Sequence, residues 1–125
     1  MAFQTYKDLE IYQLSHELAI KIHKVSLSLP KFELYEEGSQ VRRAAKSIPA
    51  NIVEGFGRRR YKNEFIRFLT FALASCDETK EHLKILSETG ALKDNDIFDG
   101  TIQKYEELGR KNHNFIKAVE SGHKT

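Results

Sequence analysis

Positively charged side chains are concentrated in the middle of the chain. Segment 42–67 carries eight Lys or Arg and two Glu, although the formal net charge of the whole chain is only +2. Arg58, Arg59, Arg60 and Lys62 form the densest part, beside the aromatic Phe56 and Tyr61. Guanidinium groups bind phosphate through paired hydrogen bonds, and aromatic rings stack on unpaired bases. We therefore hypothesise that this cluster contacts RNA or DNA phosphates, mainly electrostatically and with little sequence preference.

Three further positions are secondary candidates for the same contact: Arg42, Lys46 and Arg67. The competing interpretation of the whole cluster is a solvated run of charges, with the neighbouring aromatic side chains anchoring the loop to the core. The sequence leaves both interpretations open.

A row of polar residues precedes the basic cluster with helical spacing. It consists of Gln40, Arg43, Ser47, Asn51 and Glu54. Steps of three or four residues place this row on one helix face. The face is either a solvated flank or a network buried against another helix or subunit, with Ser75 and Glu78 as partners. In the second case we expect Arg43 to reach Glu78 and Asn51 to lie near Arg67, pairs that specify register more than they add stability.

No residue pattern matches a catalytic or metal site. The only Glu-x-x-His pattern joins Glu120 to His123, while Glu78 and His82, one helical turn apart, are better explained as an ion pair. Cys76 falls on an apolar seam and is expected to be a buried core residue. We expect no enzymatic activity, no metal and no cofactor.

Length and composition favour one domain over residues 1–125, since 40% of the residues are hydrophobic and 30% are charged. A single cysteine permits no intramolecular disulfide and suits a reducing compartment. The first ten residues are polar and resemble neither a signal peptide nor a membrane span. We expect a cytoplasmic protein that does not enter a membrane.

Helical periodicity recurs four times, predicting helices over about 8–29, 36–56, 62–89 and 94–120. The third is the clearest, because its apolar residues alternate steps of four and three, as in near-parallel helix packing. This seam consists of Phe65, Leu69, Ala72, Cys76, Thr79, Leu83 and Leu86. Short connections make successive helices antiparallel, so the predicted fold is all-α, an up-down-up-down four-helix bundle.

Residues with special backbone chemistry mark the expected boundaries. Asp8 and Asp94 are candidate N-caps, and Gly90 is the candidate residue just after the third helix. Pro30 is expected to end the first helix, and Pro49 to kink the second without ending it. Gly55 and Gly57 are expected to break the second helix.

The stretch QVRRAAKSIPANIVEGFGR, from Gln40 to Arg58, resembles the signature of four-helix bundle proteins encoded in intervening sequences of bacterial 23S rRNA. The resemblance extends to Tyr6–Tyr12 and Phe71–Glu78, and spans about residues 6–120. It implies a closed bundle and, as in several members, a ring-like homopentamer. It also implies similarity to accessory proteins of diversity-generating retroelements, which are thought to bind nucleic acid. It supplies no established biochemical activity.

The leading hypothesis is therefore a non-enzymatic homo-oligomer, expected to be a pentamer, that binds RNA or DNA. A symmetric ring would repeat the basic loop around one rim and raise the overall affinity through multiple weak contacts. The alternative is a scaffold or accessory subunit that binds another protein and has no direct nucleic-acid role. That alternative predicts an exposed apolar or acidic groove.

Overall fold

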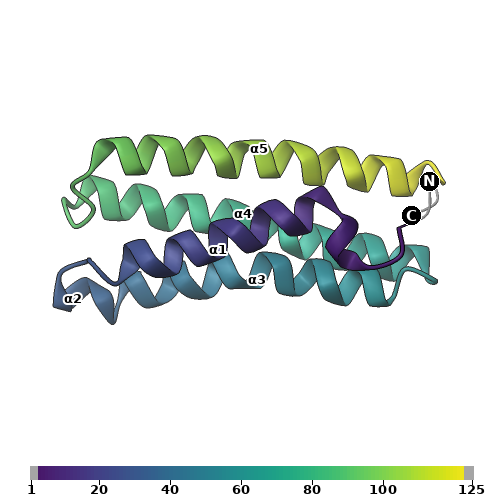
Figure 1. Ribbon diagram of the computed structural model, residues 1–125, viewed down its shortest axis with the longest axis horizontal. Coiled ribbons are helices and arrows are strands. Elements are labelled where there is room, and N and C mark those ends of the chain that lie inside the picture. The colour runs from purple at the N-terminus through teal and green to yellow at the C-terminus, as the bar shows by residue number, and fades with distance from the viewer. Residues whose placement is uncertain (1–2, 123–125) are drawn as a thin grey trace.

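Four long helices run alternately up and down in the computed structural model, which describes residues 3–122 (Figure 1). The elements are a 3-10 turn η1 (Tyr6–Asp8), α1 (Glu10–Ser26), α2 (Lys31–Leu34), α3 (Glu37–Gly57), α4 (Lys62–Glu88) and α5 (Asn95–Glu120). Around the bundle the order is α1, α3, α4, α5, with the closest packing between α3 and α4. Over the described residues no strand occurs, so the predicted all-α bundle is confirmed.

The predicted seam of α4 faces the centre of the bundle, since all seven of its residues are buried. The corresponding row on α5 includes Thr101, Tyr105, Leu108, Asn112 and Val119, which are also buried. Asn112 Nδ2 donates to the backbone oxygen of Leu69 at 3.1 Å, which fixes how α5 is rotated against α4. Burial of these side chains supplies the main driving force for association of the helices.

The structure corrects the predicted start of the first helix. Asp8 does not cap α1. Its Oδ2 atom instead accepts from the backbone N–H of Gln4 at 2.9 Å and of Thr5 at 3.1 Å, within a capping box around η1. Helix α1 begins at Glu10, after the buried Leu9. The Asp8 carboxylate belongs to the capping box of η1, a separate turn that precedes α1, so it does not cap α1.

The end of the first helix is also corrected. Helix α1 stops at Ser26, three residues earlier than predicted, and a tighter turn follows in which Leu29 N–H donates to Ser26 O at 3.2 Å. Pro30 then precedes the short helix α2, which the sequence analysis did not predict. Phe32 and Tyr35 in this segment are each 71% exposed. The segment therefore has no buried apolar face, which is the feature that helical periodicity in a sequence indicates.

Helix α3 continues through Pro49, as predicted, and the expected kink there stays a prediction. The predicted break at Gly55 is wrong, because Gly55 lies buried inside α3. A Cβ atom at this position would lie 3.0 Å from Phe68 Cβ and 3.4 Å from a ring carbon of Phe65. Gly55 therefore permits the close approach of α4. Gly57 is the last residue of α3, so the predicted end there is confirmed.

The boundaries between α4 and α5 agree with the prediction. Gly90 follows the C-cap of α4 with a φ of 83°, the left-handed conformation that favours glycine. Asp94 caps α5, and its Oδ1 atom accepts from the N–H groups of Asp96 and Ile97 at 3.0 and 3.1 Å.

We predict that Gly55→Val destabilises the protein by about 1–3 kcal/mol, because the new side chain overlaps Phe68 on α4. Gly57→Val is the matched control, since no atom lies within 4 Å of a Cβ built there. The control should change the free energy of unfolding by no more than about 0.5 kcal/mol. Guanidinium denaturation of both variants measures the difference, and equal effects would contradict the proposed helix contact.

Candidate nucleic-acid interface

Arg58, Arg59, Arg60 and Lys62 lie at the connection between α3 and α4, and are called the basic turn below. The connection sits at the end of the bundle where α5 also finishes and the described N-terminal segment begins (Figure 1). Tyr61 N–H donates to Arg58 O at 2.8 Å and tightens the turn. All four side chains of the basic turn are exposed, as a contact with a large ligand requires.

Arg58 is engaged by two carboxylates of its own chain. Its Nε donates to Glu54 Oε2 at 2.7 Å and its Nη1 to Glu64 Oε1 at 3.2 Å. The guanidinium carbon also lies 5.0 Å from the centre of the Phe68 ring. These contacts neutralise much of the local charge of Arg58 and hold it at the junction of α3 and α4.

Arg59 and Arg60 are arranged differently, because no carboxylate pairs with either within residues 3–122. The Arg59 guanidinium carbon lies 3.9 Å from the centre of the buried Phe56 ring, and Nη1 donates to Phe56 O at 2.9 Å. The Arg60 guanidinium lies 5.7 Å from the Tyr61 ring, which is 62% exposed. The two arginines therefore present full positive charge beside aromatic surface.

Lys62 is tied to the end of α5. Its Nζ donates to the backbone oxygen of Glu120 at 2.7 Å, which is one of the carbonyl groups left unpaired at a helix C-terminus. The lysine is exposed and keeps its charge. Lys62 therefore links α4 to the end of α5 and also contributes to the positive potential at this end of the bundle.

The three secondary candidates occupy unlike surroundings. Arg42 is half-buried, and donates from Nη1 to Ser26 Oγ and from Nη2 to Leu34 O, both at 3.0 Å. It joins α3 to the last residue of α1 and to the last residue of α2, so we remove it from the phosphate-binding candidates. Lys46 is exposed on α3. Arg67 is exposed on α4 but lies 3.5 Å from Glu64 and 5.3 Å from the Phe71 ring centre.

The predicted polar row does join α3 to α4 at one point. Ser47 Oγ and Ser75 Oγ are 2.9 Å apart, and Asn51 Nδ2 donates to Ser47 O at 2.9 Å and to Ser47 Oγ at 3.0 Å. The three side chains are half-buried. Short hydroxyl groups on facing helices thus fix the register of the two helices, as one of the two interpretations proposed.

The longer pair expected between Arg43 and Glu78 is wrong. Arg43 and Gln40 are exposed, and Glu78 contacts His82 Nε2 at 3.2 Å instead of Arg43. Asn51 donates to Ser47, and its expected position near Arg67 stays a prediction. Glu54 turns to Arg58 one helical turn away. Local i,i+4 partners were available for these charges, and such partners cost less side-chain entropy than a long reach across helices.

His82 forms a contact that the sequence analysis missed. Its Nδ1 atom lies 2.7 Å from Glu37 Oε2, 45 positions earlier, while the expected pair with Glu78 is confirmed. The imidazole thus connects the first turn of α3 to α4, at the end of the bundle opposite the basic turn. No periodic pattern in the sequence predicts this pair. Glu37 lies at the end of α3, where no apolar stripe shows which neighbouring helix its side chain is directed toward.

The remaining candidates offer no reactive arrangement. Burial raises the pKa of Cys76 to about 11, and its Sγ donates to Tyr105 O at 3.3 Å, so the thiol is held protonated in the core. Residues 3–122 contain no cluster of three or more potential metal ligands, and His123 lies outside the described residues. In the same range, no helix has both the length and the apolar character needed to cross a bilayer.

Comparison with known proteins gives a family match. The family model described as 23S rRNA-intervening sequence protein matches residues 7–114. The chain belongs to this family. The match contains α1 to α4, the basic turn and most of α5. The resemblance drawn from the Gln40–Arg58 stretch is therefore confirmed.

A solved structure shares the fold of this 23S rRNA-intervening sequence protein. It is the crystal structure of a protein with unknown function from the S23 ribosomal protein family of Bacteroides thetaiotaomicron VPI-5482. The two chains are 24% identical and superpose with a TM-score of 0.76, and the match covers 86% of this chain and 95% of the other. No curated protein matches this chain. The comparisons thus establish family and fold.

Only some of the contacts at and next to the basic turn could be predicted from this family member's sequence. The pairs Glu54–Arg58 and Glu64–Arg67 have helical i,i+4 and i,i+3 spacing, which was a usable signal. The pair Arg58–Glu64 crosses the turn, and the Lys62–Glu120 contact joins residues 58 positions apart. These two contacts depend on how the turn folds and on where α5 ends.

We predict that Arg42→Ala lowers the free energy of unfolding by about 1–3 kcal/mol, since it removes two hydrogen bonds to partly buried oxygens. Lys46→Ala removes the same charge from an exposed site on the same helix and should cost no more than about 0.5 kcal/mol. Thermal denaturation of both variants tests this assignment, which is wrong if the two variants melt alike.

Proposed function

We propose that this protein is a non-enzymatic, homo-oligomeric nucleic-acid-binding protein of the cytoplasm that contacts phosphates through its basic turn. The observation that carries the proposal is the pair Arg59 and Arg60, two exposed guanidinium groups with no carboxylate partner in residues 3–122. Lys62 adds charge at the same end. Guanidinium groups bind phosphate oxygens through paired hydrogen bonds.

The geometry ranks the candidate contacts. Arg59 and Arg60 come first, because even Arg59, which donates one hydrogen bond to Phe56 O, keeps four further N–H donors. Lys62 comes second, because its ammonium group keeps two after bonding to Glu120 O. Arg58 and Arg67 rank lower, since Glu64 lies within 3.5 Å of both and must be displaced or screened before either binds a phosphate. Lys46 remains a peripheral contact on α3. Arg42 has no part in the proposal.

Aromatic surface next to the arginines favours unpaired bases over duplex. Tyr61 is 62% exposed, and Phe71 is 42% exposed beside Arg67. Stacking of a base on an exposed ring contributes about 1–3 kcal/mol and tolerates any base. The proposed contact is therefore a single strand of RNA or DNA, held mainly by its backbone.

Self-association is the second part of the proposal. One basic turn offers few phosphate contacts, so useful affinity requires several copies acting together. The half-buried Ser47, Asn51 and Ser75, together with Phe71 one helical turn before Ser75 on α4, supply a mixed surface of the kind found in subunit contacts. The pentamer implied by the resemblance would place five basic turns in one assembly.

We predict that Arg59→Ala/Arg60→Ala weakens binding of labelled single-stranded RNA and DNA and flattens its salt dependence. The slope of log K against log salt should fall in magnitude by roughly 0.7–0.9 for each phosphate that the variant no longer neutralises. Fluorescence anisotropy across a salt series measures both quantities.

The control variant is Lys31→Ala/Lys93→Ala. It removes the same charge from exposed positions in α2 and in the α4–α5 connection, segments at the opposite end of the bundle (Figure 1). Binding by the control should stay close to that of the unchanged protein. Equal losses in the two variants would show that overall charge, rather than the basic turn, holds the nucleic acid. No binding at low salt would overturn the proposed function.

We predict a solution mass of five times the 14.5 kDa of one chain. Light scattering coupled to size-exclusion chromatography determines this mass directly. A monomer at micromolar concentration would contradict the self-association on which the affinity argument depends, and another closed oligomer would correct only the number of copies.

A further inference from the structure

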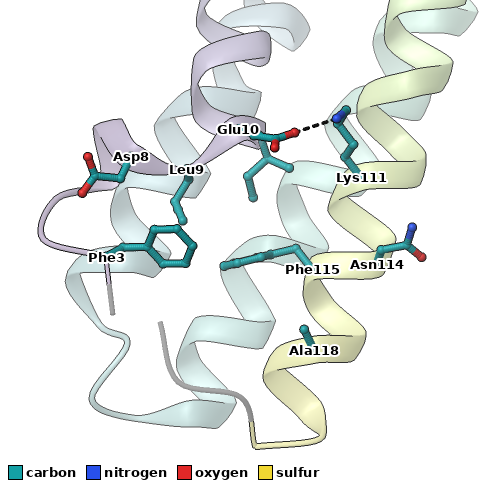
Figure 2. A pocket seen from close by; sticks show the side chains of 9 residues that line it. Phe3, Asp8, Leu9, Glu10, Lys111, Asn114, Phe115 and Ala118 are labelled. Carbon is teal, nitrogen blue, oxygen red and sulfur yellow. Dashed lines mark hydrogen bonds and ion pairs between the residues drawn. The ribbon is translucent and has the colours of Figure 1, made fainter. Parts of the chain in front are cut away.

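A groove follows the seam between α1 and α5, which is the least closely packed of the four helix–helix contacts. Near the N-terminal segment it widens into an open pocket of about 420 Å³ (Figure 2). A second hollow of about 410 Å³ continues along the same two helices and shares Glu10 and Lys111 with the first. The two hollows thus form one surface, called the α1–α5 groove below.

The wide end of the α1–α5 groove has apolar walls. Phe3 and Leu9 approach from the N-terminal segment, and Phe115 and Ala118 from α5, with the side chains converging on the space between them (Figure 2). The Phe3 and Phe115 rings meet edge to face, with centroids 6.3 Å apart. Such a volume lies in the range of about 300–1,000 Å³ found for ligand pockets, and suits a large apolar side chain.

The rim of the groove is acidic. Asp8, Glu10, Glu17 and Glu107 line it, against one ammonium group, that of Lys111. Lys111 forms an ion pair with Glu10, whose Oε2 accepts a hydrogen bond from Lys111 Nζ at 2.6 Å. Outside the lining, Lys104 lies 3.8 Å from Glu107. The excess of carboxylates disfavours phosphate here and favours a positively charged partner.

The family match covers only part of the pocket lining. It covers residues 7–114, whereas Phe3, Phe115 and Ala118 lie outside it. The aromatic wall is therefore a feature of this chain beyond the matched segment. It is also the kind of apolar, acidic groove that the scaffold alternative predicted.

We propose that the α1–α5 groove is the docking site for a basic amphipathic segment of another protein. The segment places an aromatic or large aliphatic side chain in the pocket, against the Phe3 and Phe115 rings and Ala118. Its Lys or Arg residues lie beside Glu17 and Glu107. An amphipathic helix fits this description, because a groove between two helices accepts apolar anchors at helical spacing while the rims pair with flanking charges. The basic turn stays free, so one molecule can hold nucleic acid and protein on separate surfaces.

The test uses two synthetic helical peptides of about 18 residues, or five turns, with one Phe on a shared apolar face. One carries Lys on its polar face and the other carries Glu. Titration of the ¹⁵N-labelled full chain should give micromolar binding of the Lys peptide, with shifted amide signals at Glu10, Lys111, Phe115 and Ala118. The Glu peptide should bind at least about tenfold more weakly. Equal binding of both peptides, no binding of the Lys peptide at millimolar concentration, or shifts confined to other surfaces would overturn the proposal.

Two variants of the groove sharpen the test. Ala118→Trp fills the pocket and should reduce the affinity for the Lys peptide at least tenfold, whereas Ala74→Trp, at an exposed position on α4, should leave it unchanged. Glu17→Lys/Glu107→Lys reverses the rim charge without touching the core, and should also reduce the affinity at least tenfold. Loss of the oligomeric state in Ala118→Trp would identify a second copy as the occupant and refute a separate partner. Arg59→Ala/Arg60→Ala should bind the peptide normally, so the two proposals fail independently.

Discussion

The close contact between α3 and α4 is the constraint on which the other features depend. Gly55 brings the two backbones together against Phe68, and the Ser47–Ser75 hydrogen bond of 2.9 Å sets their register. A short turn then has to join the two helices, which places three arginines and a lysine at one tip of the bundle. Their exposure follows from this geometry, because the ends of packed helices cannot be covered by the helices themselves.

A row of contacting aromatic rings lies next to both of the proposed surfaces. Phe3 contacts Phe115, Phe115 contacts Phe65, and Phe65 contacts Phe56, with centroids 6.3, 5.8 and 6.4 Å apart. The Arg59 guanidinium lies on the last of these rings. One edge-to-face cluster thus extends from the α1–α5 groove to the basic turn. Such packing stabilises the end of the bundle and holds the two surfaces in a constant relative position.

Charge is separated over the surface of this small bundle. Arg59 and Arg60 present unpaired positive charge at the tip, while carboxylates predominate along the α1–α5 groove. Arg58 is held by Glu54 and Glu64 at the junction of α3 and α4, so it adds little to the charge of the tip. Opposite potentials on separate faces select chemically different partners, because each face repels the ligand of the other.

Periodicity within the sequence determined the four long helices, the buried seam of α4 and the position of the basic turn, because helical spacing and caps are local properties. The i,i+4 pair of Glu54 with Arg58 was determined in the same way. Tertiary structure alone decided that Arg42 is bound inward, that Lys62 meets Glu120, and that Phe3 faces Phe115. These contacts depend on the rotation and axial shift of one helix against another, which result from packing of the whole core and have no signature in any single segment.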